Sequence, residues 1–353
     1  QQGAVNLLVE SAAQQLVNGD LALAALDGVN GYRLDGVSPN DATGRGVNGV
    51  GDVNGDGLAD FMLGAFLASP GGHTEAGSGK LVFGRTTSLG ATLDTGDVAS
   101  DVVMHFNSTV DGERIGFAVS AAGDIDGDGL GDFLVGAFSS PQNNYVGSAY
   151  VVLGKALAGF GANVALDSLD GSTGFKVSGI NGFDGLGFSV AGGGDINGDG
   201  LDDFMISAYG YDQPVGYAGA TYVIFGRTDA FAATLDLNSL DGTDGFRIEG
   251  AGAGDRSGHA VASGDFNGDG FADVIVGANF ASGSEHYSGS AFVVFGHDGS
   301  FTPTLSLSAP EVLRIDGAVS GDYAGFALAS AGDINGDGYD DIIIGATGVD
   351  AGE

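Results

Sequence analysis

The chain has 353 residues, with 46 Asp and Glu against 11 Lys and Arg, and its net charge of −35 makes nucleic acids and anionic membrane surfaces unfavourable partners. It contains no cysteine, which excludes a disulfide scaffold and a cysteine zinc site. It also has no apolar run long enough for a membrane-spanning helix, so we expect no membrane insertion. Hydrophobic residues make up 43% of the sequence and 68 glycines divide them into short runs, so we expect a buried core connected by tight turns.

The predicted elements are short β-strands, and a first pair stands near the N-terminus. It comprises GAVNLLVE, from Gly3, and LDGVNGYRLDG, from Leu26. Later units each have four strand candidates. In the second unit GFAVSA starts at Gly116, a second strand follows an aspartate-rich loop, and GSAYVVLG and LDGSTGFKVSG start at Gly147 and Leu169. Val, Ile, Phe and Tyr dominate these runs and no window has a helical period, which indicates strands.

An aspartate-rich string recurs five times and defines the repeat. Its copies are GDVNGDGLADFMLGA, GDIDGDGLGDFLVGA, GDINGDGLDDFMISA, GDFNGDGFADVIVGA and GDINGDGYDDIIIGA. Successive copies are 72, 71, 70 and 68 residues apart, counted between the leading aspartates Asp52, Asp124, Asp195, Asp265 and Asp333. Four short strands in each repeat are typical of a propeller blade.

The two ends of the chain complement each other. The last unit stops after IIIGATGVDAGE, before a third and a fourth strand, and the N-terminal pair supplies strands of these two types. We therefore predict an all-β fold: a five-bladed β-propeller of four-stranded antiparallel blades, closed by N- and C-terminal strands that share one blade and leave no open edge. A piece of a longer array that closes differently is the alternative. The predicted single domain covers 1–353, with repeats at 37–106, 107–179, 180–249, 250–317, and 318–353 plus 1–36.

The aspartate-rich string has the composition of a calcium loop. Side chains with oxygen ligands stand at positions 1, 3, 5 and 9, a glycine at position 6 permits a sharp turn, and position 7 can offer its backbone carbonyl. All-oxygen ligation on a flexible loop favours Ca²⁺ over Mg²⁺ or a transition metal, so we predict about five calcium ions, one in each repeat. The predicted ligands are Asp52, Asn54, Asp56, Leu58 and Asp60; Asp124, Asp126, Asp128, Leu130 and Asp132; Asp195, Asn197, Asp199, Leu201 and Asp203; Asp265, Asn267, Asp269, Phe271 and Asp273; and Asp333, Asn335, Asp337, Tyr339 and Asp341.

Two other interpretations of the string are an EF-hand and a set of plain turns. An EF-hand requires a glutamate at position 12 and flanking helices, but the flanks here are predicted strands. Position 12 is instead occupied by Leu63, Val135, Ile206, Val276 and Ile344. A single Asp-Gly-rich copy could be a turn, whereas five copies with every ligand position filled favour a metal site.

With these motifs the sequence resembles the FG-GAP repeats of integrin α-subunit heads, in which a Gly-Phe strand precedes a D-x-D-x-D-G-x-x-D calcium loop. The corresponding phrases here include GFAVSA followed by GDIDGDGLGDFLVGA, and the resemblance covers nearly the whole chain. It implies a calcium-binding β-propeller whose calcium loops lie on a lower face. It also implies that ligands bind an upper face, formed by the loops between strands two and three of a blade (2–3 loops) and those leading from strand four into the next blade (4–1 loops).

The 2–3 loops vary in sequence while the strands hardly do, and variable loops on a rigid scaffold are where recognition usually occurs. Tolerated surface variation explains the pattern equally well. The loops span residues 66–76, 138–146, 209–218, 279–288 and the junction of 347 with 2. They carry Tyr145, Tyr209, Tyr211, Tyr217, Tyr287, His73 and His286.

Every 4–1 loop has an acidic residue three positions before its glycine. We expect these acids to stabilise turns through backbone amides. Alternatively, they line the upper mouth and bind a cationic group, and arginines close by in three repeats make local pairing plausible. The acids are Asp41, Glu113, Asp184, Asp255 and Asp322, and the arginines are Arg45, Arg114 and Arg256.

These observations favour a calcium-stabilised binding or adhesion module of bacterial extracellular type, at the cell surface or in a larger surface polypeptide, that recognises a protein or glycan ligand. A lectin-like propeller and a propeller-fold enzyme are the alternatives. A lectin should repeat aromatic residues at matching positions, and we expect the loop tyrosines not to align. An enzyme should have unique residues in one repeat, and the most divergent stretch offers only His105, Asp111 and Glu113. We therefore predict no catalytic residues and no organic cofactor.

Overall fold

The computed structural model describes residues 4–8, 23, 26–29, 31–88, 90–96, 102–139, 144–157, 163–212, 216–283 and 285–348. Across these ranges the chain is built from β-strands and short 3₁₀ turns, and no helix is long and apolar enough to cross a membrane. The turns are η3 (Pro70–Gly72), η6 (Leu166–Ser168) and η7 (Leu237–Ser239). This agrees with the all-β fold expected from the sequence.

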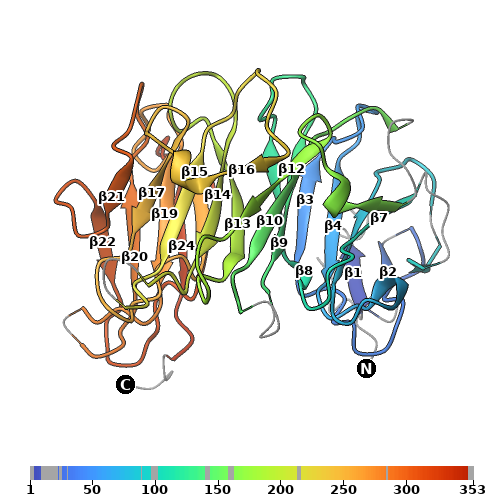
Figure 1. The fold of residues 1–353 in the computed structure, drawn as a ribbon, viewed down its shortest axis with the longest axis horizontal. Coiled ribbons are helices and arrows are strands. Elements are labelled where there is room, and N and C mark those ends of the chain that lie inside the picture. Colours follow the sequence, from blue (N-terminus) through green and yellow to red (C-terminus); the bar gives the residue numbers. More distant parts are fainter. Residues whose placement is uncertain are drawn as a thin grey trace.

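Four blade-like antiparallel sheets follow one another along the chain and lie side by side in Figure 1. Blade A contains β3 (Val47–Gly51), β4 (Asp60–Ala65), β5 (Ser78–Val82) and β7 (Val103–Asn107). Blade B contains β8 (Ile115–Gly123), β9 (Asp132–Ala137), β10 (Ser148–Val152) and β12 (Gly174–Ser178). Blade C contains β13 (Leu186–Gly194), β14 (Asp203–Ala208), β15 (Ala220–Ile224) and β17 (Gly245–Glu249). Blade D contains β18 (Val261–Gly264), β19 (Asp273–Ala278), β20 (Ser290–Val294) and β22 (Leu313–Asp316).

A short parallel strand covers the outer edge of several sheets. It comes from the connection between strands three and four of the following blade, so each blade lends a strand to the one before it. A covered edge cannot pair with another chain. The pairs are β6 (Thr92–Asp94) on β2 (Gly31–Asp35), β11 (Asn163–Ala165) on β7, β16 (Thr234–Leu235) on β12 and β21 (Thr304–Ser306) on β17.

The hydrophobic core lies between the blades, because alternate residues of each strand face opposite neighbours. In β9, Phe133 and Val135 join the cluster shared with blade A, whereas Leu134 joins the cluster shared with blade C. All three side chains are fully buried. A strand in the middle of the array is therefore apolar on both faces, which explains the continuous hydrophobic runs of the sequence.

Glycines bring the first strand of one blade into backbone contact with the second strand of the blade before it. A Cβ atom on Gly64 would lie 1.9 Å from the carbonyl oxygen of Gly116, and one on Gly136 would lie 2.3 Å from that of Gly187. Gly116 and Gly187 also have φ angles of 78° and 80°, a left-handed conformation that favours glycine. The glycine of the Gly-Phe phrase in one blade thus meets the Gly-Ala strand end of the blade before it.

Among the described strands, no pairing joins the two ends of the array into the predicted shared blade. β1 (Ala4–Leu8) and β2 form a sheet with β6, while β23 (Ala327–Ser330) and β24 (Ile342–Gly345) form a separate pair. In Figure 1, β1 and β2 lie at the right end of the molecule and β24 lies in its left half. In the part of the chain that the structure describes, neither β1 nor β2 pairs with β23 or β24. The predicted ring closure therefore stays a prediction.

Candidate metal loops and ligand face

The five aspartate-rich strings fold into loops of the same design, which we call the metal loops (52–60, 124–132, 195–203, 265–273 and 333–341). In the second loop, Asp124 Oδ1 accepts hydrogen bonds from the N–H groups of Gly127 at 2.9 Å and Asp128 at 3.0 Å, and Oδ2 accepts one from Gly129 at 2.9 Å. The other four loops repeat these three bonds from their own first aspartate. The first aspartate therefore organises the turn through these hydrogen bonds alone.

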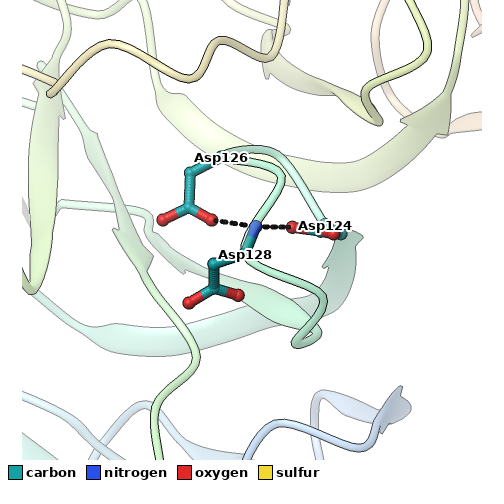
Figure 2. Close-up of side chains that lie close together, drawn as sticks. All are labelled: Asp124, Asp126 and Asp128. Atoms are coloured by element: carbon teal, nitrogen blue, oxygen red, sulfur yellow. Dashed lines mark hydrogen bonds between the residues drawn. The ribbon is translucent and has the colours of Figure 1, made fainter.

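The second loop brings three carboxylates together. One oxygen from each of Asp124, Asp126 and Asp128 lies within 4.8 Å of the other two, and Figure 2 shows the side chains around the bend of the loop. Burial and the charges of Asp128 and Asp124 raise the pKa of Asp126 above its ordinary value. A carboxylate whose pKa is raised by burial and by the charges of its neighbours is in an electrostatic setting that a divalent cation would relieve.

The remaining loops have asparagine where the second has Asp126, and this changes their internal bonding. The Asn54 amide donates to Asp56 at 3.2 Å, and Asn197 and Asn267 donate at 2.9 Å to Asp199 and Asp269. Asp126 cannot donate such a bond as a carboxylate. The second loop therefore has more negative charge and less internal compensation than these three.

The ninth-position aspartates lie at the base of the loops and not within the carboxylate cluster. Asp132 is fully buried and accepts N–H bonds from Ile125 at 2.9 Å and from Gly154, after the third strand, at 2.7 Å. Burial raises its pKa to about 7, and does the same for Asp203. For Asp60 and Asp273 burial raises the pKa to about 6. These aspartates connect the loop to the blade by hydrogen bonds. Their role as metal ligands stays a prediction.

Neighbouring metal loops also contact one another, which the sequence did not indicate. Asp202 of the third loop accepts the backbone N–H of Asp124 at 2.8 Å, and Asp340 of the fifth accepts that of Asp265 at 3.1 Å. The side chain at the seventh position of a loop packs against the preceding loop; Leu130 of the second loop, for example, lies beside Gly55 of the first. Its N–H donates to the fifth-position carboxylate, and the predicted role of its carbonyl is untested.

On the opposite strand ends, each described 2–3 loop is hydrogen-bonded to the next 4–1 loop. The N–H of Arg114 donates to the Glu75 carbonyl at 3.2 Å, and that of Arg256 donates to Tyr217 at 3.2 Å. Two further bonds have the same form: the N–H of Gly185 donates to the Tyr145 carbonyl at 2.9 Å, and that of Tyr323 donates to the Tyr287 carbonyl at 3.3 Å. We call these four contacts the first to fourth junctions, in the order Glu75–Arg114, Tyr145–Gly185, Tyr217–Arg256 and Tyr287–Tyr323.

The junctions correct our expectation that the loop tyrosines do not align. Tyr145, Tyr217 and Tyr287 occupy one position, two residues before the glycine that opens strand three, and all have left-handed φ angles of 51° to 54°. Tyr217 is 50% exposed and Tyr287 40% exposed. The loops differ in length ahead of this position, so only counting backward from the glycine reveals the alignment.

The acids of the 4–1 loops behave as turn-stabilising residues. The carboxylates of Asp41, Asp184 and Asp322 are buried, and each accepts the backbone N–H of the residue three positions before it, at 2.7 to 3.0 Å. Glu113 differs, because it accepts bonds from the Tyr150 hydroxyl and the Lys176 amine, both at 2.7 Å. Burial and these bonds favour the turn interpretation over a cation-binding mouth.

The structure separates the residues considered for catalysis. Glu113 belongs to the buried group just described, and Asp111 Oδ1 lies 3.5 Å from His73 Nδ1. His105 lines a cavity of about 370 Å³ with Lys80 and Asp41. Lys80 is only 1% exposed, and burial lowers the pKa of its amine. Among the described residues no side-chain hydrogen bond or ion pair holds this amine, and no sequence signal marked it.

Known proteins share the repeats found here. The FG-GAP repeat matches residues 186–224, 257–294 and 324–353. Integrin alpha-5 of Xenopus laevis is 30% identical over 251 residues, which cover 69% of this chain and 21% of that protein. Phosphatidylinositol-glycan-specific phospholipase D of Bos taurus is 35% identical over 158 residues (43% and 17%), and integrin alpha-PS2 of Drosophila melanogaster is 29% identical over 194 (54% and 13%). The chain thus spans about a fifth or less of these relatives. The resemblance expected from the motifs is confirmed: the chain contains FG-GAP repeats and is homologous to integrin α subunits.

Proposed function

We propose that this chain is an integrin-like, calcium-stabilised propeller module that binds a protein ligand through its upper face, at the cell surface or outside the cell. The observation that supports calcium most directly is the cluster of Asp124, Asp126 and Asp128 in a loop whose design recurs in every repeat. Homology to integrin α subunits supports a protein ligand and an extracellular setting. Calcium would be held by the oxygen ligands of the metal loops and would neutralise their facing carboxylates.

Calcium in this proposal stabilises the fold and takes no part in chemistry. A metal that binds only the folded chain adds about 2.7 kcal/mol per site when its free concentration is about 100 times Kd. With several sites, chelation should lower the melting temperature strongly in calorimetry. Asp128→Ala and Asp199→Ala should each remove part of the calcium-dependent increase. Coincident melting curves with calcium and with chelator would overturn the proposal.

The second loop provides an internal control for this experiment. Asp126→Asn gives it the asparagine of the other loops, which donates to the fifth-position carboxylate in three of them. We expect the variant to be more stable than the parent in chelator, since it removes one charge, and to gain less from calcium. An equal gain from calcium in both proteins would contradict our expectation that the extra carboxylate of Asp126 makes the second loop bind calcium most tightly.

A glycan ligand is the second candidate, and the aligned tyrosines favour it. Tyr145, Tyr217 and Tyr287 repeat one aromatic position along the upper face, which is the arrangement expected of a lectin-like propeller. A glycan array probed with the calcium-loaded protein tests this candidate. Exchange of residues 209–218 for 66–76 tests the face for either ligand, because binding that survives the exchange would place the ligand elsewhere.

A further inference from the structure

The four junctions place two residues next to each other at every contact between described blades, and in all but the second, where one residue is Gly185, both carry a side chain. Both residues have left-handed backbones: Glu75 and Arg114 have φ angles of 48° and 61°, and Tyr217 and Arg256 have 52° and 53°. Because the backbone geometry is the same, the side chains at equivalent positions can be compared directly. The first junction can therefore serve as a reference for the side-chain contacts at the third.

The first junction contains a satisfied ion pair. Arg114 Nε donates to the Glu75 carboxylate at 3.0 Å, and a second guanidinium nitrogen reaches the same oxygen. The third junction has an arginine at the same position but a tyrosine in place of the glutamate. The Arg256 guanidinium lies 4.8 Å from the Phe280 ring centroid and 5.9 Å from that of Tyr209, and none of the ion pairs among the described residues includes it.

The acids closest in sequence to the third junction already have other partners. Asp212 accepts the N–H of Tyr217 at 2.9 Å, and Asp255 interacts with the charge of Arg314 and has a backbone hydrogen bond with Gly252. The neighbouring Arg314 is already paired with Asp316 at 2.6 Å. Arg256 thus retains an unneutralised charge in a chain whose net charge is −35.

Two hollows meet at this residue. One has a volume of about 270 Å³ with walls from Phe138, Tyr145, Phe183 and Tyr209. The other has about 500 Å³, with Phe280 and Tyr287 in its wall together with the charged Asp255 and Arg314. Tyr217 and Arg256 belong to both. A cation between aromatic walls is a setting in which a carboxylate and an apolar group can be bound together, and Tyr and Arg are enriched in the centres of protein interfaces.

We propose that the third junction binds an acidic side chain of a protein ligand, with Arg256 pairing with the carboxylate and the aromatic walls holding an adjacent apolar side chain. The ligand carboxylate would take the place that Glu75 fills in the first junction. A densely acidic partner is disfavoured by the net charge of the chain, so the ligand presents an isolated acid beside an apolar residue. This deepens the proposed function and rests on its claim that the upper face binds protein.

Selection and titration of peptides test the assignment. A displayed library of random peptides with amidated C-termini is selected on the calcium-loaded protein, and an enriched peptide is titrated by fluorescence anisotropy together with its Asp→Asn or Glu→Gln form. We expect enrichment of single acids next to apolar residues. Binding should weaken at least about tenfold for the neutral peptide, for Arg256→Gln, and for Tyr217→Glu, which rebuilds the first junction's ion pair.

Matched variants separate this claim from a loss of folding and from the broader proposal. Glu75→Gln breaks the other ion pair and should leave binding unchanged, and Tyr217→Glu should retain the parent melting temperature because Glu75 already occupies this backbone conformation. If the enriched peptides contain no acidic residue, or if the parent protein and Arg256→Gln bind the peptide with equal affinity, the carboxylate site is wrong. The upper face would still stand as the proposed binding surface. If a glucuronate-ended saccharide binds through Arg256 and no peptide does, the assignment to a protein ligand is wrong.

Discussion

The strand after the metal loop has three consecutive apolar residues in both the second and the fifth repeats, but a different environment in each. In β9, Phe133, Leu134 and Val135 are all fully buried. In β24 the equivalent residues are isoleucines, yet Ile343 is 55% exposed. β9 has β10 beside it and a blade against each face, whereas among the described strands β24 is paired with β23 alone. Burial in this fold is therefore conferred by neighbouring blades, so stability depends on interfaces as much as on the repeat itself.

The largest expected effect comes from truncating the two equivalent side chains. Leu134→Ala leaves a cavity between blades B and C and should lower the free energy of unfolding by about 2–5 kcal/mol. Ile343→Ala removes a half-exposed side chain and should cost less than about 1 kcal/mol. Denaturant unfolding of both variants checks the difference. Equal losses would show that β24 is covered in solution.

A disulfide between the ends tests whether β24 finds its missing neighbour in β1. Pairing of β9 with β10 places Leu134 opposite Val151, and by the same register Ile343 would stand opposite Leu7. The chain has no cysteine, so Ile343→Cys with Leu7→Cys introduces the sole pair. In a closed ring we expect an intramolecular bond that raises stability by about 2–4 kcal/mol, detected by gel mobility with and without reductant. Persistent free thiols under oxidation would contradict the predicted closure.

A smaller effect is expected at a buried polar position that differs between blades A and B. Tyr150 is hydrogen-bonded to Glu113, whereas the equivalent Lys80 is buried with a lowered pKa. Lys80→Met should stabilise the fold by about 1–3 kcal/mol at neutral pH, since burial disfavours the charged form of the lysine amine.

The pH dependence of the same variant has a definite sign. With the folded pKa below the ordinary value of 10.5, the unfolded chain holds a proton that the folded chain has lost, so parent stability rises as pH increases toward 10.5. The advantage of Lys80→Met should therefore shrink toward alkaline pH in paired thermal melts. A constant difference at all pH values would mean that the lysine does not titrate abnormally.

The sequence predicted the features that repeat within one strand or loop. All five metal loops and the strands around them follow from local spacing, because the same side chains meet the same backbone each time. The parallel edge strands escaped notice since runs such as Thr92–Asp94 have three residues and one buried side chain. The junction tyrosines were obscured by unequal loop lengths, and the approach of the two ends depends on the packing of whole blades.

The strand that each blade lends to its predecessor has a consequence for synthesis on the ribosome. The outer edge of blade A ends at Asn107, and its cover begins at Asn163, which is 56 residues later. At about 5–20 residues per second, that edge is exposed for about 3–11 seconds in each nascent chain. During this time it can pair with a neighbouring nascent chain on the same message. Synonymous codons that slow translation between these positions should therefore increase co-translational aggregation, while slow codons after Ala165 should have little effect.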